Sequence, residues 1–152
     1  MNHKRSTVDI LLVDDDADDR NIFSDALSEL KINTNLVLLE DGRNLLSYLK
    51  NKKNKRPHIL FLDLNMPYKT GVECLMEIRQ YTDFDDLTIA IYSTSSTDKD
   101  IEETFVNGAN IYIKKPKNFD KLKNVLNDVV NMNFQFHNSG LNKDTFILNM
   151  NA

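Results

Sequence analysis

Carboxylate, hydroxyl and ammonium side chains stand where four apolar runs of this sequence end. They are Asp14 and Asp15, Asp63, Ser93 and Lys115, which end or follow the runs at 9–13, 59–62, 88–93 and 110–114. Carboxylates about 4 Å apart repel by about 4 kcal/mol per pair at an effective dielectric of 20, so such a cluster requires a cation. Oxygen ligands beside a phosphate favour Mg²⁺, and an aspartate is a known phosphoryl acceptor. A lysine and a hydroxyl would bind phosphoryl oxygens, so phosphoryl chemistry is the expectation.

Each of these residues also has a purely structural explanation. Asp15 could cap a helix, Ser93 could form a turn and Lys115 could lie on the surface. Ligands of open α/β sheets bind beyond the carboxyl ends of the strands, which is where all these groups would meet. We therefore favour one shared site over separate structural roles.

The elements that must position these groups alternate along the chain. Strands are expected at 9–13, 36–39, 59–62, 88–93 and 110–114, and helical spacing of apolar residues lies between and after them. Five alternations predict an α/β fold with a parallel sheet and helices on both faces.

Local signals set several boundaries. Residues 33–35 are expected to form a turn, and Gly71 to supply a permissive backbone position after Met66-Pro67 breaks the third strand. Thr97 with Asp100 suggests a variant capping box for the fourth helix, which would end at Gly108. Val72, Leu75, Met76 and Ile78 are expected to face inward from the third helix.

Composition indicates one ordinary globular domain. The chain has 152 residues, 41% of them hydrophobic and 28% charged, and its net charge of −4 gives no case for nucleic acid or membrane binding. No apolar run approaches the roughly 18 residues of a membrane span and no signal peptide is evident, so a cytoplasmic location is expected.

Two further features are interpreted as structural, without a role in chemistry or binding. The single cysteine, Cys74, is interpreted as a small buried hydrophobe, and the three histidines lack metal-ligand spacing. The stretch 50–56 holds five basic residues, and we favour a solvated loop over a patch for an anionic partner.

The motifs together resemble a known family. Val13-Asp14-Asp15, Asp63-Leu64-Asn65-Met66-Pro67 with Gly71, Ser93, and Lys115-Pro116 are similar to those of the receiver domain of bacterial two-component response regulators. The resemblance covers residues 7–131 as the receiver domain and leaves a C-terminal tail, 132–152, of unknown role. It implies a flavodoxin-like (βα)5 doubly wound parallel sheet with strand order 2-1-3-4-5.

The resemblance also implies roles for the acidic residues. Asp63 would accept a phosphoryl group from a sensor histidine kinase or a phosphotransfer protein. Asp14, Asp15 and Asp63 would hold Mg²⁺ together with the backbone carbonyl of Asn65, and Asp15 would be the more direct ligand. The protein would signal by contact with a downstream protein target rather than act as an enzyme.

Lys115, Ser93 and Tyr112 would complete the switch on the same resemblance. Lys115 would contact the phosphoryl group, and Ser93 would move to hydrogen-bond it and draw Tyr112 inward. The chain departs from the family pattern at Lys69, which adds a positive charge near Asp63, and at Thr94, where the family favours a smaller residue.

Two rival functions and two finer expectations remain. The rivals are a receiver-like interaction module that works without phosphorylation and a metal-dependent phosphatase with an aspartate nucleophile. Such phosphatases usually have a second aspartate where this chain has Asn65.

The acidic run 14–19 is similar to that of receivers that partner bacteriophytochrome-type kinases. The output face of such a receiver is formed by its fourth helix, fifth strand and fifth helix. Apolar residues in the tail, Phe134, Phe136, Phe146 and Leu148, predict docking onto this output face and a homodimer, and the alternative is a disordered tail.

Overall fold

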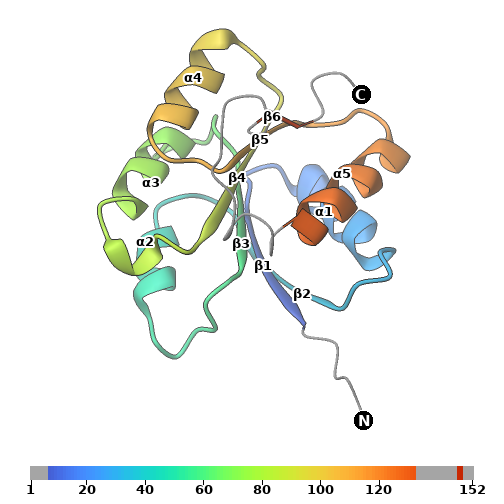
Figure 1. The fold of residues 1–152 in the computed structure, drawn as a ribbon, viewed down its shortest axis with the longest axis horizontal. Coiled ribbons are helices and arrows are strands. Elements are labelled where there is room, and N and C mark those ends of the chain that lie inside the picture. Colours follow the sequence, from blue (N-terminus) through green and yellow to red (C-terminus); the bar gives the residue numbers. More distant parts are fainter. Residues whose placement is uncertain (1–6, 133–146, 149–152) are drawn as a thin grey trace.

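The computed structural model describes residues 7–132 and 147–148, in which strands and helices alternate (Figure 1). The elements are β1 (Val8–Val13), α1 (Ala17–Ser28), β2 (Thr34–Leu39), α2 (Leu45–Lys50), β3 (Ile59–Leu62), α3 (Gly71–Ile78), the short 3-10 helix η1 (Thr82–Phe84), β4 (Thr88–Ser93), α4 (Asp98–Val106), β5 (Ile111–Lys114), α5 (Phe119–Met132) and β6 (Ile147–Leu148). The predicted α/β class is therefore confirmed. None of the helices in the described part of the chain combines the length and the apolar character that a membrane span requires.

The sheet is parallel, and its strands follow the order β2-β1-β3-β4-β5-β6. The first five strands have the predicted order 2-1-3-4-5. The sixth was not predicted and comes from the tail: Ile147 lies opposite Tyr112, and Leu148 opposite Ile113. These two residues pair with a strand of the predicted output face. The predicted tail anchors at 134, 136 and 146 lie outside the described residues.

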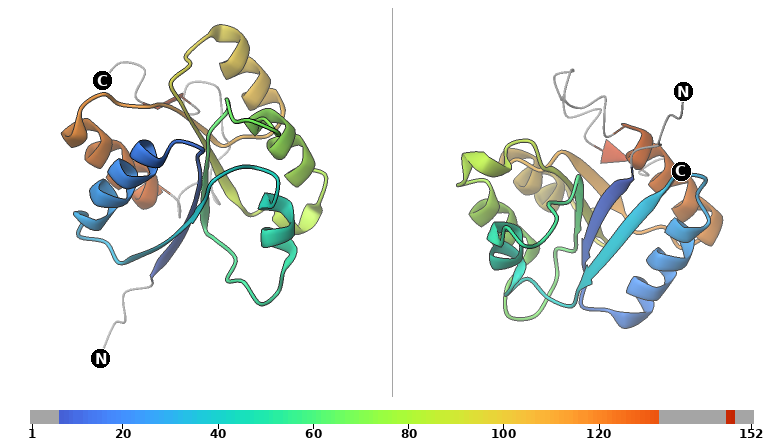
Figure 2. Two further views of the ribbon diagram at one scale, coloured as in Figure 1. Left: turned by 180° about the vertical axis from the view of Figure 1, so that it is seen from behind. Right: turned by 90° about the horizontal axis from the view of Figure 1, so that it is seen from below.

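Helices cover both faces of the sheet, with α1 and α5 on one side and α2, α3 and α4 on the other (Figure 2). All residues of β1, β3 and β4 are buried. A strand covered on both faces has no side that favours polar residues, which explains the continuous apolar runs. The core is thus two apolar layers separated by the sheet.

One boundary prediction and one burial prediction are wrong. Strand β2 begins at Thr34, inside the predicted turn, because pairing with β1 starts at Val8 opposite Thr34. Met76 was expected to face inward but is 49% exposed. The short helix α3 buries Cys74, Leu75 and Ile78, and a residue that follows Leu75 by about 100° of rotation faces away from that side.

The helix caps show what the sequence signals specify. The Thr97 hydroxyl accepts a hydrogen bond from the backbone N–H of Asp100 at 3.2 Å, so the predicted start of α4 is confirmed. Gly108, with φ of 97°, follows the end of that helix as predicted. A complete capping box that was not predicted joins Thr70 and Glu73 at the start of α3.

Candidate functional site

Three aspartates meet where β1 and β3 end. One carboxylate oxygen from each of Asp14, Asp15 and Asp63 lies within 4.8 Å of the others. Asp14 is fully buried, Asp63 is 6% exposed, and Asp15 is exposed. The structure therefore brings together the three side chains that were predicted from the sequence to be metal ligands.

Backbone pairing fixes this meeting point. The register places Val13 opposite Leu62, and the N–H of Asp63 donates to the carbonyl of Val13 at 3.0 Å. The N–H of Asp14 donates to the carbonyl of Leu39 at 3.2 Å. The two aspartates are thus the first residues beyond adjacent parallel strands, and the sheet itself holds their like charges together.

Gly71 is required for a different reason from the predicted one. The φ of Gly71 does not lie in the left-handed region. Among the described residues of this loop, it is Tyr68 that adopts a left-handed conformation, with φ of 68°. A Cβ at Gly71 would lie 2.2 Å from the carbonyl oxygen of Asp63, and the Gly71 N–H donates to the Leu64 carbonyl at 2.8 Å. Close approach of the α3 start to the end of β3 therefore excludes a side chain here.

Lys115 brings positive charge into the cluster. Its Nζ lies 2.8 Å from Asp14 Oδ2, 2.8 Å from Asp19 Oδ2 and 3.5 Å from Asp63 Oδ2. Burial alone would lower the pKa of Lys115, but its close contacts with the Asp14 and Asp19 carboxylates and the nearby charge of Asp63 raise it. The lysine therefore stays charged between three carboxylates.

Asp19 is a member of this site that was not predicted from the sequence. Its backbone N–H donates to Oδ1 of the N-cap residue Asp16 at 3.0 Å, which places its side chain in the first turn of α1, against Lys115. The sequence feature that could have predicted Asp19 is its position about one helical turn after Asp15, on a helix that starts at the same edge of the sheet.

The surroundings of Asp63 disfavour its charge in the absence of a metal. Burial raises its pKa to about 7; Lys115 opposes that shift, Asp14 and Asp15 add to it, and a backbone hydrogen bond from Asn65 opposes it. A carboxylate so destabilised gains more from a cation than an ordinary one. The described hydrogen bond of Asn65 involves its N–H, so metal binding by its carbonyl stays a prediction.

The acidic cluster fits a hard divalent cation. Asp14 Oδ2 is buried and receives no hydrogen bond among the described residues, although it forms the ion pair with Lys115. Carboxylate oxygens from three residues that lie within 4.8 Å of one another are the donors that Mg²⁺ and similar ions prefer.

Ser93 and Tyr112 lie beside each other behind the site. The buried Ser93 accepts a hydrogen bond through Oγ from the N–H of Ser95 at 3.1 Å, and the Tyr112 hydroxyl donates to the Ser95 carbonyl at 2.7 Å. Tyr112 is fully buried, so its ring already faces inward in this structure. Thr94 is exposed, next to this pair. The predicted movement of the two switch residues stays a prediction.

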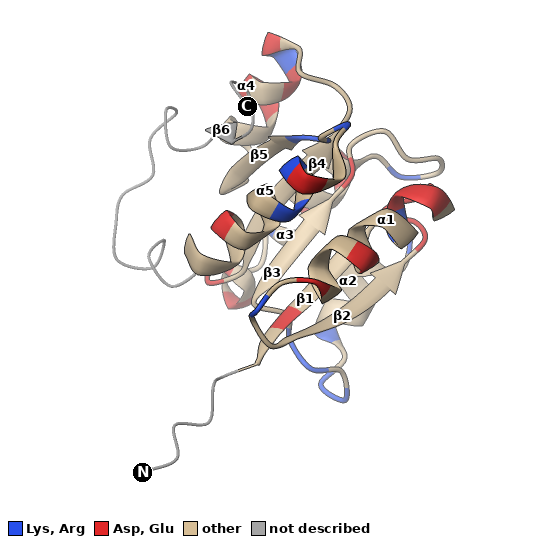
Figure 3. Ribbon diagram, turned by 90° about the vertical axis from the view of Figure 1, so that its right-hand side faces the viewer, with Lys and Arg blue, Asp and Glu red and all other residues tan. Residues whose placement is uncertain are grey.

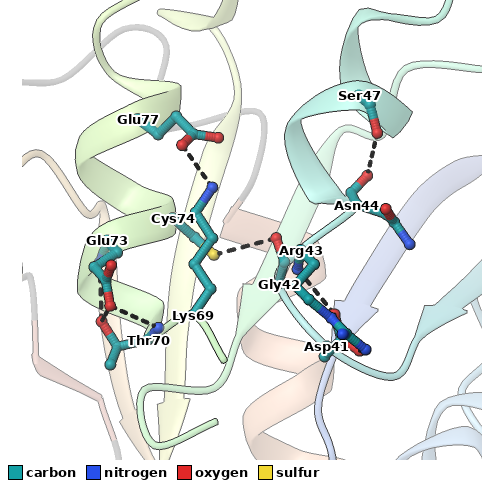
Figure 4. Close-up of polar contacts among 10 residues, drawn as sticks. All are labelled: Asp41, Gly42, Arg43, Asn44, Ser47, Lys69, Thr70, Glu73, Cys74 and Glu77. Carbon is teal, nitrogen blue, oxygen red and sulfur yellow. Dashed lines mark hydrogen bonds and ion pairs between the residues drawn. The ribbon is translucent and has the colours of Figure 1, made fainter. Parts of the chain in front are cut away.

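The loop after β3 directs the charge of Lys69 toward helix α3 (Figure 4). The Lys69 ammonium pairs with Glu77 on α3 at 2.5 Å. This ion pair gives the added charge a partner other than Asp63.

Two contacts join that region to the loop before α2. The Arg43 guanidinium lies over the ring of Tyr68, 3.8 Å from its centroid, and also pairs with Asp41. The Cys74 thiol donates to the Gly42 carbonyl at 3.7 Å, a contact that is drawn in Figure 4. Cys74 is buried as predicted, and burial raises the pKa of its thiol to about 11.

The basic stretch 50–56 lies at the other end of the sheet, before β3, whereas acidic residues gather at the start of α1 (Figure 3). All five basic side chains are exposed, as expected of a solvated loop. Lys50 and Arg56 lie over the rings of Tyr81 and Phe84, at 3.8 and 4.7 Å from the centroids. This loop is thus remote from the acidic site.

The fold and the acidic edge together define a receiver domain. The chain matches the family model described as response regulator receiver domain over residues 10–127, and it belongs to that family. It is therefore a receiver domain of the two-component response regulators, whose partners are sensor kinases or phosphotransfer proteins.

The chain is also similar to individual response regulators. The chain is 31% identical over 117 residues to the response regulator Rcp1 of Synechocystis sp., covering 74% of this chain and 80% of the relative. It is 29% identical over 121 residues to a chemotaxis protein CheY homologue of Campylobacter jejuni, covering 80% of this chain and 91% of the relative.

Solved structures agree with these relatives. The Mn(2+)-bound form of Rcp1 has a TM-score of 0.73 and 27% identity, covering 89% of this chain and 99% of that one. The phosphorylated cyanobacterial phytochrome response regulator RcpA has a TM-score of 0.77 and 27% identity, covering 85% and 95%.

Proposed function

We propose that Asp63 accepts a phosphoryl group from a phosphohistidine of a sensor histidine kinase, with Mg²⁺ held by Asp14, Asp15, Asp63 and the carbonyl of Asn65. The observation that carries this proposal is the convergence of two further carboxylates and the ammonium of Lys115 around Asp63. A structural role for any one of these residues does not explain why repelling charges are held together.

The side chains divide the chemistry between them. A carboxylate oxygen of Asp63 attacks phosphorus, the N–P bond breaks, and its electron pair returns to the imidazole of the donor. Lys115 lies beside Asp63 and would bind a phosphoryl oxygen. Bound Mg²⁺ would supply positive charge to the phosphoryl oxygens and offset the repulsion that raises the pKa of Asp63.

Ser93 and Tyr112 would transmit the effect of phosphorylation from the site to the surface of the protein. The Ser93 hydroxyl would turn from the Ser95 N–H toward a phosphoryl oxygen and so alter the loop that binds the Tyr112 hydroxyl. Tyr112 belongs to β5, which suits signalling to a downstream protein through the face formed by α4, β5 and α5.

A partner surface adjoins the acidic site. A hollow of about 190 Å³ between α1 and the segment after β5 is lined by Asp19, Ile22, Lys115 and Phe119, among others. Ile22 is 46% exposed and Phe119 38% exposed. Apolar side chains exposed beside a phosphoacceptor suit the docking of the kinase that must deliver the phosphoryl group.

The input kinase is proposed to be of the phytochrome type. Support comes from similarity to Rcp1 and to RcpA, the second of which is described as a cyanobacterial phytochrome response regulator. Phosphotransfer from a phytochrome-type kinase should outpace transfer from an unrelated sensor kinase by at least about tenfold. Equal rates would remove the support for this narrower partner.

The tail suggests a homodimer. Strand β6 pairs with β5 through only two described residues, and exchange of the β6 strands between two copies would keep the same register. Sizing the full chain against a chain that ends at Asn131 tests this, because equal monomeric masses for both would contradict the dimer.

The central experiment measures covalent phosphorylation. Wild-type protein, Asp63→Asn and Asp18→Asn are incubated with Mg²⁺ and acetyl phosphate and then weighed intact. We expect one added phosphoryl group on the wild type and on the Asp18 control, and none on Asp63→Asn. An unmodified wild type would favour the interaction module that works without phosphorylation, and a phosphoester that survives acid would contradict Asp63 as the acceptor.

A further inference from the structure

We propose that Asp19 is a positioning residue that holds the Lys115 ammonium in place to receive a phosphoryl group on Asp63. This inference rests on the proposed function and adds a residue to it. The ammonium has three N–H donors and three carboxylate neighbours, Asp14 and Asp19 at 2.8 Å and Asp63 at 3.5 Å. Two short contacts therefore fix the ammonium, while the longer one leaves room toward the acceptor.

Asp19 is itself held by the start of helix α1. The N-cap side chain of Asp16 accepts a hydrogen bond from the Asp19 N–H at 3.0 Å, which fixes the backbone from which its carboxylate extends. The first turn of a helix also stabilises a negative charge. A rigid chain of contacts thus runs from the helix cap through Asp19 to Lys115.

The two anchors of Lys115 differ once a cation is considered. Asp14 belongs to the three-aspartate cluster that fits a divalent ion, whereas Asp19 is not one of its members. A cation bound to Asp14 would repel the ammonium and compete for the same carboxylate. Asp19 would remain as an anchor outside the metal site, so Lys115 would keep its position while the phosphoryl group is transferred.

Removing Asp19 should therefore slow phosphorylation without weakening the metal site. At saturating Mg²⁺, we expect Asp19→Ala to react with acetyl phosphate about 10- to 100-fold more slowly than the wild type, since misplacement of a group by about 1 Å can cost about 10²-fold. Mg²⁺ affinity should change less than about twofold. Asp18→Ala is the matched control, since it removes the same charge from the same helical turn at an exposed position.

A double-mutant cycle identifies the route of the effect. If Asp19 acts through Lys115, then Asp19→Ala should slow phosphorylation in the wild-type background and add nothing to Lys115→Met. Equal slowing in both backgrounds would overturn the proposal, as would an Asp19→Ala variant that reacts as fast as the wild type or faster. A faster variant would mean that Asp19 repels the donor or restrains the lysine.

A second measurement does not depend on phosphorylation. NMR of the Lys115 ammonium at saturating Mg²⁺ should show a protected, slowly exchanging group in the wild type and in Asp18→Ala, and fast exchange in Asp19→Ala. Unchanged protection in Asp19→Ala would overturn the positioning role. A wild type that shows this protection but gains no phosphoryl group would contradict the proposed function and leave the contact itself supported.

Discussion

A buried aspartate lies at each end of strand β1, Asp9 inside the strand and Asp14 directly after it, and the two sites differ in what surrounds the charge. Asp9, at the amino end, lies 3.3 Å from Lys55 Nζ and accepts a hydrogen bond from Asn35 at 3.3 Å. Asp14, at the carboxyl end, shares one lysine with two further carboxylates. The same residue type is thus paired with a cation and an amide at one end and crowded by like charges at the other.

This difference separates a structural aspartate from a functional one. Burial alone does not, because Asp9 is 6% exposed and Asp14 is fully buried. A protein stabilises an isolated buried carboxylate by giving it a partner, whereas unrelieved repulsion among several carboxylates indicates a ligand that arrives later. The following predictions compare the two ends of β1, from the largest expected effect to the smallest.

Replacing Lys115 should lower the free energy of unfolding more than replacing Lys55. Lys115→Met leaves Asp14, Asp19 and Asp63 without their shared cation, and we expect the metal-free free energy of unfolding to fall by about 3 kcal/mol. Lys55→Met should cost less than about 1 kcal/mol, since the Lys55 side chain is 72% exposed and its ion pair is screened by solvent. Urea unfolding of both variants without metal measures the difference, and equal losses would contradict the distinction.

Removal of the Asp63 charge should stabilise the metal-free protein. The pKa of about 7 in the folded state, against an ordinary value of 3.8, means that the folded protein binds this proton more tightly than the unfolded chain does. The destabilisation is therefore absent below about pH 4, grows up to about pH 7 and is complete above that. We expect Asp63→Asn to gain about 2 kcal/mol at pH 8 and almost nothing at pH 4. A gain of the same size at both pH values would rule out this cause.

Magnesium should relieve the same repulsion. At about ten times its dissociation constant, mass action adds about 1.4 kcal/mol to the free energy of unfolding and raises the Tm by a few degrees. Asp15→Ala should remove most of that rise, whereas Asp18→Ala should keep it, because Asp18 is not in the carboxylate cluster. A wild-type Tm that does not change with millimolar Mg²⁺ would count against the metal site.

The sequence predicted the sheet and most of the site because both follow from one local pattern. Apolar runs that end in Asp14, Asp63 and Ser93 specify strands buried on both faces, and parallel pairing then brings their ends together without any knowledge of side-chain geometry. The same argument anticipated Lys115 after the fifth strand.

Features that depend on three-dimensional packing were missed. Asp19 joins the site only because the Asp16 cap sets the rotation of α1, and the role of Gly71 depends on how closely α3 approaches β3. The sixth strand has only two described residues, and no hydrophobic period is visible over such a length.

Substitution at the amino end of β1 should have the smallest effect and leave the metal response intact. Asp9→Asn preserves an acceptor for the Asn35 amide and removes the charge that faces the exposed Lys55. The backbone N–H of Asp9 still donates to Nδ1 of His58, since that bond does not involve the substituted side chain. We expect a loss of about 0.5–1 kcal/mol at pH 7, because the surviving hydrogen bonds maintain the local structure and only a solvent-screened ion pair is lost. The Mg²⁺-induced rise in Tm should equal that of the wild type, measured by thermal melts with and without metal. A diminished rise would show that the two ends of β1 are coupled, and the comparison between a structural and a functional aspartate would then fail.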